Sequence, residues 1–284
     1  MNGAAPAEVL RVEDLHLEIR QAGRASVILR GVDLAVSAGR IHALVGESGG
    51  GKSMVTKAVT GLLPETAVIT QGRIVLAGQH VTHWAPREWR AVRGTVVSMV
   101  LQDPMTALNP VRRIGAQLGD VLRLHRGLRG AALQQECLQL LEQVQVRDPE
   151  VVLRQYPHQL SGGMRQRVVI AIAWACKPQL IICDEPTTAL DVTVQKQVLR
   201  LIKQLAQAGQ GVLMVTHDLG VVAKLCDTMS VIHGGRILEA GTVAEVFAAP
   251  RFDQPGETLT PVEDALLEQL DQEERDYDAQ CEKA

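Results

Sequence analysis

The chain has no long apolar run. None of its segments reaches the roughly 18 consecutive apolar residues that a membrane-spanning helix requires, and the most apolar stretch, 168–176, is short enough for a buried helix. The first six residues also lack the charged and apolar regions of a signal peptide. We therefore expect any contact with a membrane to be made through a partner.

Excess basic charge and paired cysteines are missing as well. The formal net charge of -3 argues against nucleic acid as the main partner, because proteins that bind a phosphate backbone concentrate Lys and Arg. The five cysteines have no C-x-x-C spacing, which argues against a disulfide framework or a metal cluster and favours a reducing cytosol. They are Cys137, Cys176, Cys183, Cys226 and Cys281, of which we interpret Cys176 and Cys183 as small core residues.

The apolar content is sufficient for a buried core. At 284 residues and 46% hydrophobic, the chain can form one large α/β domain or two small ones. Residues 9–45 alternate in short apolar runs that break at Gly23 and at Ala38-Gly39. This pattern predicts an antiparallel strand layer, to which residues 72–78 return as a further strand.

Beyond that layer, strands and helices alternate, which implies a mostly parallel sheet. Between Pro110 and Tyr156 helical periodicity dominates, and it predicts a separate helical lobe inserted at about residues 103–160. We expect one domain over residues 1–250. Strands are expected at 41–45, 96–101, 180–183, 212–216 and 229–233, and helices at 52–62, 162–176, 192–208 and 219–225.

The sequence after Pro250 turns acidic and low in apolar residues. We expect an acidic C-terminal tail over 251–284, in the form of a solvated helix or a frayed end. An acidic contact surface for a partner is the alternative, and no residue pattern favours it.

A glycine-rich loop follows the strand expected at 41–45 and leads into a helix. Backbone N–H groups at a helix N-terminus bind phosphates, and glycines let the backbone approach them closely. The pattern therefore predicts a P-loop, in which Lys52 contacts the β- and γ-phosphates of ATP and the Ser53 hydroxyl ligates Mg²⁺. Its residues are Gly46, Glu47, Ser48, Gly49, Gly50, Gly51, Lys52 and Ser53.

Two carboxylates stand at the end of the apolar strand expected at 180–183. Buried strands rarely end in adjacent ionised groups unless a cation or a reaction uses them, because such charge needs compensation. We interpret Asp184 as a group that holds Mg²⁺, and Glu185 as the general base that orients or deprotonates the attacking water. The alternative is a helix N-cap ahead of Pro186.

A second phosphate-binding pattern opens the helix expected at 162–176. It consists of Leu160, Ser161, Gly162, Gly163 and Met164, followed by Arg165-Gln166-Arg167. Small residues at a helix N-terminus again make an anion site. A P-loop alone is shared by many nucleotide-binding families. A P-loop followed by this LSGGxxQR signature and a strand ending in Asp-Glu resembles the ABC-type ATPases.

The resemblance implies a fold and further roles. The family fold is a P-loop NTPase (RecA-like) α/β core with a mostly parallel sheet, an N-terminal antiparallel β layer and an inserted α-helical subdomain. Gln102 resembles the Q-loop glutamine that contacts Mg²⁺ and the attacking water. His217 resembles the switch histidine, and Asp191 the D-loop residue that crosses the dimer interface. In this family each ATP lies between the P-loop of one subunit and the signature of another, which implies that the chain is half of a dimer.

Longer motifs at 102–110, 156–159 and 184–195 narrow the resemblance to the ATPase subunits of dipeptide, oligopeptide and nickel importers, over roughly residues 9–250. Met164 further resembles the D-type subunit, which pairs with a different, F-type ATPase subunit. The implied partners are therefore that subunit, two transmembrane permease subunits and, indirectly, a solute-binding protein. The implied location is the cytoplasmic face of the inner membrane, as a peripheral subunit.

The chain departs from the family pattern in three places. Ile19 stands where an aromatic residue usually stacks on adenine, and since stacking is worth roughly 1–3 kcal/mol, we expect ATP to bind up to about tenfold more weakly if Ile19 gives only apolar contact. Gly50 replaces a common serine but keeps the backbone N–H. After Pro250 a His-Pro-Tyr-Thr segment and a cysteine cluster are absent, so we predict no iron–sulfur site.

We therefore expect an ATP-hydrolysing subunit that energises a bacterial importer for peptides or for nickel and metal chelates. One alternative is a catalytically silent ATP-binding partner subunit, against which Lys52, Glu185 and His217 argue. Another is a soluble ABC ATPase that acts on DNA or ribosomes. The chain has no second cassette, coiled-coil insertion or basic surface to support it.

Overall fold

A computed structural model describes residues 7–21, 23–188 and 190–249. The tail predicted over 251–284, with Cys281, lies outside these residues. Within them, no helix combines the length and the apolar character needed to cross a membrane.

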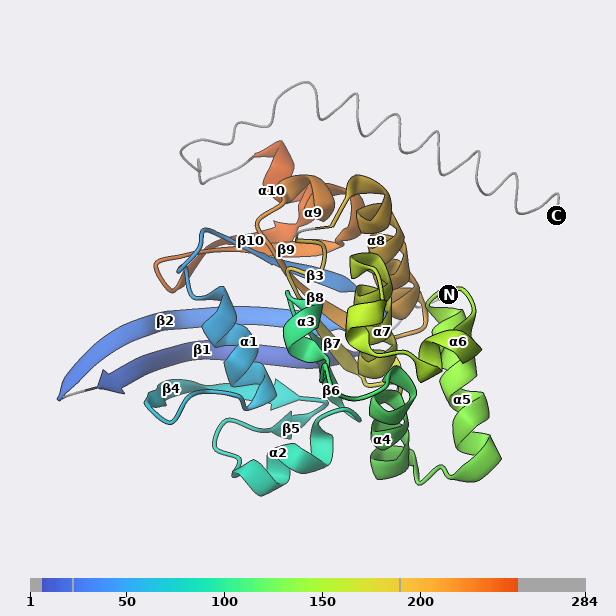
Figure 1. The fold of residues 1–284 in the computed structure, drawn as a ribbon. Helices are drawn as coiled ribbons and strands as arrows, with labels where there is room; N and C mark the ends of the chain where they lie inside the picture. Colours follow the sequence, from blue (N-terminus) through green and yellow to red (C-terminus); the bar gives the residue numbers. More distant parts are fainter. Residues whose placement is uncertain (1–6, 22, 189, 250–284) are drawn as a thin grey trace, which may run out of the picture.

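Four strands form an antiparallel sheet along one side of the molecule, in the order β2-β1-β4-β5 (Figure 1). The predicted breaks at Gly23 and at Ala38-Gly39 are turns. The strand predicted at 72–78 begins at Ala67 and ends at Leu76. It ends early because Ala77 and Gly78 have positive φ and turn the chain into β5. The strands are β1 (Glu8–Gln21), β2 (Arg24–Ser37), β4 (Ala67–Leu76) and β5 (Gln79–His80).

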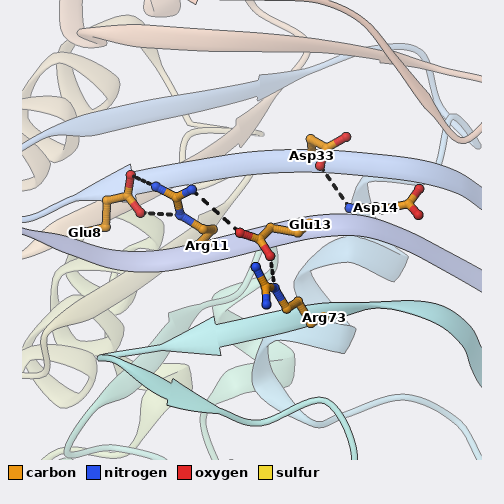
Figure 2. A network of polar contacts seen from close by, with 6 residues as sticks. All are labelled: Glu8, Arg11, Glu13, Asp14, Asp33 and Arg73. Atoms are coloured by element: carbon orange, nitrogen blue, oxygen red, sulfur yellow. Dashed lines mark hydrogen bonds and ion pairs between the residues drawn. The ribbon is translucent and has the colours of Figure 1, made fainter.

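A network of polar contacts joins charged side chains of this sheet (Figure 2). Arg11 lies between Glu8 and Glu13, with a distance of 3.6 Å from its Nη1 to the Glu13 carboxylate. Glu13 also pairs with Arg73 on the neighbouring strand. Exposed ion pairs of this kind contribute about 0–1 kcal/mol each, so the network adds little to stability.

The central sheet has six strands in the order β10-β9-β3-β8-β7-β6, parallel except for β10. The predicted strands are all present, whereas β10, β5 and the helices α2 (Pro86–Val92) and α10 (Val243–Ala248) were not predicted. The sheet consists of β3 (Ile41–Val45), β6 (Val97–Val100), β7 (Leu180–Asp184), β8 (Gly211–Thr216), β9 (Thr228–His233) and β10 (Arg236–Thr242).

The parallel strands of the central sheet contribute to cores on both of its faces, because successive side chains of a strand point to opposite faces. Ile182 and Leu213 belong to the core shared with the antiparallel sheet and α1, and Ile181 and Cys183 belong to the core shared with the helices. Cys183 is thus a core residue as predicted, whereas Cys176 is only partly buried against the same core.

Helices cover the other side of the sheet (Figure 1). α4, α5 and α6 contact one another and form the helical lobe, and α7 lies between them and α8. The predicted fold class is therefore confirmed, while the boundaries at residues 103, 160 and 250 stay predictions. The helices are α1 (Lys52–Thr60), α3 (Pro104–Ala107), α4 (Ile114–Arg126), α5 (Gly130–Gln143), α6 (Pro149–Arg154), α7 (Gly162–Trp174), α8 (Val192–Gln207) and α9 (Leu219–Leu225).

Candidate functional site

The glycine-rich loop, residues 46–53, leaves β3 and enters α1. Gly49 and Gly51 have φ of 84° and 112°, in the left-handed region that favours glycine. Gly46 is constrained differently, because a Cβ added there would lie 2.1 Å from the carbonyl oxygen of Ile232 on β9. These glycines are therefore needed to build the loop itself, whatever it binds.

The turn between β9 and β10 braces this loop from behind. The Gly235 N–H donates to the Gly50 carbonyl at 3.0 Å, and the Gly235 carbonyl accepts from the Arg30 N–H at 2.8 Å. A Cβ on Gly235 would lie 2.0 Å from the Ile28 carbonyl oxygen. The loop is thus held between β2 and a turn that lies far along the chain.

Lys52 is the buried cation of the loop, with 7% of its surface exposed. Its Nζ donates to the carbonyl oxygens of Gly46 and, at 2.9 Å, Glu47. Burial lowers the pKa of Lys52, and the carboxylates of Glu185 and Asp184 act in the opposite direction. An ammonium beside exposed backbone and near two carboxylates is suited to hold a phosphate together with a metal ion.

Asp184 is the last residue of β7, and its surroundings suit a divalent cation. Burial raises the pKa of its carboxyl group, and the neighbouring charge of Glu185 raises it further, against the effects of Lys52 and Lys57. A bound cation would reverse this shift. Carboxylate and hydroxyl oxygens are ligands that Mg²⁺ prefers, so Asp184 and Ser53, which is exposed on the first turn of α1, fit a magnesium site.

Glu185 contacts the other two predicted catalytic residues, Gln102 and His217. Gln102 donates from Nε2 to Glu185 Oε2 at 2.7 Å, and His217 Nδ1 lies 3.2 Å from Glu185 Oε1. The three residues follow β6, β7 and β8, which are neighbours in the sheet and end at the same edge. A carboxylate held between an amide and an imidazole can accept a proton from water, as a general base does.

Thr188 belongs to the same cluster and was missed by the sequence analysis. Its hydroxyl donates to Glu185 Oε2 at 3.1 Å. The available signal was the turn pattern, since Pro186 occupies the second position of a turn that starts at Glu185 and ends at Thr188.

The signature residues open α7. The hydroxyl of Ser161 caps the helix by accepting from the Met164 N–H at 3.3 Å. Ser161 and Gly162 are exposed, while a Cβ on Gly163 would lie 2.5 Å from Val194 of α8. Leu160 is buried, and Met164 packs against the helical core. The helix N-terminus is thus open to an anion, and Figure 1 shows α7 separated from α1 by α3.

Arg167, also missed by the sequence analysis, anchors α7. Its guanidinium donates to the carbonyl oxygens of Val144 at 2.9 Å and Gln145 at 2.8 Å, at the end of α5. It also donates to Gln197 Oε1 on α8 at 2.6 Å. The side chain is 8% exposed, and burial lowers its pKa. One cation therefore joins the helical lobe, the signature helix and α8.

Asp191 and Ile19 complete the set of predicted site residues. Asp191 is exposed and caps α8, where its carboxylate accepts from the Val194 N–H at 3.0 Å. Ile19 is partly exposed on β1, where it pairs with Ser26 and Ala67 of the neighbouring strands.

The chain is similar to known proteins along most of its length. The family model described as ABC transporter matches residues 29–188. The dipeptide transport ATP-binding protein DppD of Bacillus subtilis is 42% identical over 271 residues, which cover 90% of this chain and 81% of that protein. The probable D,D-dipeptide transport ATP-binding protein DdpD of Escherichia coli is 46% identical over 245 residues, which cover 86% and 75%.

A solved structure supports the fold. A dimeric ATP-binding cassette bound to ADP and Pi superposes with a TM-score of 0.73 at 24% identity and covers 82% of this chain and 98% of its own. Since the family model matches more than half of the chain and the DppD relative is aligned along most of its length, the chain belongs to the ABC transporter family.

Proposed function

We propose that the chain is the ATP-hydrolysing subunit that drives a bacterial peptide importer. The proposal rests on the Glu185 carboxylate, which Gln102 and His217 contact at 2.7 and 3.2 Å. The charges of Glu185 and Asp184 also raise the pKa of Lys52, against the effect of burial. Membership of the family makes the chain an ATPase of the ABC type.

ATP binding is assigned to the glycine-rich loop. The backbone N–H groups of residues 46–53 and the Lys52 ammonium hold the phosphates. The oxygens of Ser53, Asp184 and Gln102 hold Mg²⁺, which when bound neutralises charge that develops on the phosphates. Ile19 provides an apolar contact for the adenine.

Hydrolysis is assigned to Glu185. Its carboxylate orients the attacking water and accepts a proton from it. Gln102 and His217 fix the two carboxylate oxygens from opposite neighbouring strands, so the base is preorganised before water arrives.

The second ATPase subunit completes the site. Ser161 and Gly162 are exposed at the N-terminus of α7, and Asp191 is exposed at the start of α8, which supports a role for both in a dimer interface. We propose a heterodimer with an F-type subunit, bound to two permease subunits at the cytoplasmic face of the inner membrane. The helical lobe is the part that meets the permeases.

Peptide is the cargo class that the relatives' names support, since two of them are named for dipeptide transport. Nickel or a metal chelate is the second candidate. Purification of the tagged chain from gently solubilised membranes tests the assembly, because an importer predicts two permeases, a second ATPase and a solute-binding protein. Recovery with ribosomes or DNA would instead support a soluble ABC ATPase.

The catalytic assignment is tested with Glu185→Gln in the assembled complex. Loss of the general base should slow hydrolysis at this chain's site about 10²–10⁴-fold and leave ATP binding intact, so chromatography of released nucleotide should find ATP where the wild type holds ADP. Glu142→Gln, an exposed change on α5, is the matched control. Unchanged hydrolysis in Glu185→Gln would favour a catalytically silent subunit.

A further inference from the structure

The turn that carries Glu185 is closed twice by Thr188. The Thr188 N–H donates to the Glu185 carbonyl at 3.3 Å, and the Thr188 hydroxyl donates to the Glu185 carboxylate at 3.1 Å. Glu185 itself has a φ of 46°, in the left-handed region that a residue with a long side chain adopts at a cost. Its N–H donates to the Val215 carbonyl of β8 at 2.8 Å, which ties the turn to the sheet.

The hydrogen bonds distinguish the two carboxylate oxygens. Oε2 accepts from both Gln102 and Thr188, at 2.7 and 3.1 Å. Among the described residues, the hydrogen-bond neighbour of Oε1 is His217 Nδ1, at 3.2 Å. Each oxygen of an ionised carboxylate offers about two acceptor positions. Oε2 is therefore fully used, and Oε1 keeps a position for water.

We propose that Thr188 is a positioning residue for hydrolysis: its hydroxyl, together with Gln102, occupies Oε2 and so directs Oε1 toward the attacking water. This inference rests on the proposed function, since it requires Glu185 to be the base. In the step, a proton leaves water for Oε1 while the water oxygen bonds to the γ-phosphorus. The bond from that phosphorus to the bridging oxygen of ADP breaks, which leaves ADP and phosphate.

The expected effect is moderate because Thr188 is exposed, so water competes with its hydroxyl. Loss of one such bond corresponds to about a 3- to 10-fold change in rate. The change belongs in kcat, because the hydrogen bonds of Thr188 within the described part of the chain go to Glu185, the base, and not to the glycine-rich loop.

The test measures kcat and KM for ATP in the assembled complex with Thr188→Val, which keeps the branched shape and removes the hydroxyl. We expect kcat to fall about 3- to 10-fold with KM little changed, and Thr188→Ser to restore it. Thr188→Ala should reproduce the loss if the valine variant folds poorly. The control is Thr95→Val, because the Thr95 hydroxyl donates to the carbonyls of Ala91 and Val92, away from Glu185.

Wild-type kcat in Thr188→Val, a Thr188→Ser variant as slow as the valine variant, or an equal loss in Thr95→Val would each overturn the inference. Glu185→Gln, measured alongside, separates the two levels. If Glu185→Gln stops hydrolysis and Thr188→Val changes nothing, only the role of Thr188 is wrong. If Glu185→Gln leaves hydrolysis unchanged, the proposed base is wrong and the role of Thr188 falls with it.

Discussion

Replacing Arg167 by Met should destabilise the folded chain more than any single surface change. The guanidinium satisfies the carbonyl oxygens of Val144 and Gln145 and the side chain of Gln197, at 2.6–2.9 Å. Methionine fills similar space but donates nothing, so the Val144 carbonyl and the Gln197 amide lose partners in a buried region. At about 0.5–1.5 kcal/mol for each of the three lost bonds, the free energy of unfolding should fall by about 2–4 kcal/mol.

Thermal unfolding followed by circular dichroism measures this loss. For a chain of this size, each kcal/mol shifts the midpoint by roughly 2–4 °C, so we expect a decrease of about 5–15 °C. Hydrogen exchange should rise most at the end of α5, which the guanidinium caps. Arg87→Met, an exposed change on α2, is the control. A decrease below about 2 °C, or equal effects in both variants, would refute the role given to Arg167.

Three other predictions concern buried groups. Burial lowers the pKa of His42 from 6.5 to about 4, so the stability that neutral His42 contributes above pH 6.5 is lost as pH falls toward 4. In denaturant titrations at a series of pH values, His42→Gln should remove up to about 3 kcal/mol of that loss, and the same dependence of unfolding free energy on pH in both proteins would contradict this. Gly46→Ala should weaken nucleotide binding at least about tenfold, because the added Cβ would lie 2.1 Å from the Ile232 carbonyl oxygen. Gly49→Ala meets open space and adds only about 1–2 kcal/mol of backbone strain, so it should weaken binding less. Similar affinities for both variants in a fluorescent-nucleotide titration would contradict this prediction. Burial raises the pKa of Cys183 to about 12, so peptide mapping should show it unalkylated by iodoacetamide at neutral pH unless the chain is unfolded.

The sequence predicts the central sheet and the glycine-rich loop well because periodicity decides them. β7 and β8 are apolar on both faces, and the observed strands differ from the predicted ones by one residue at an end. β10 was missed for the opposite reason, since it alternates between exposed and half-buried positions and contains no buried residue. Local pattern identifies a strand only when burial dictates the residues.

The candidate site divides along the same line. Glu185 could be predicted from its place at the end of an apolar strand, whereas the roles of Gln102 and His217 followed from the resemblance to the ABC-type ATPases. The sheet order β8-β7-β6 brings the three residues together. The role of Arg167 could not be predicted, because its acceptors lie on α5 and α8 and depend on how three helices pack. Tertiary contacts of this kind leave no signature at the residue itself.

The brace behind the glycine-rich loop has a consequence for how the chain is made. The Ile232 carbonyl that confines Gly46 belongs to β9, and the Gly235 N–H that holds Gly50 belongs to the turn after it, so each is synthesised more than 180 residues after the glycine it contacts. A nascent chain in which β9 and β10 have not yet left the ribosome therefore lacks the contacts that hold the phosphate-binding loop. The phosphate-binding loop therefore takes its final form only after β9 has joined the central sheet beside β3.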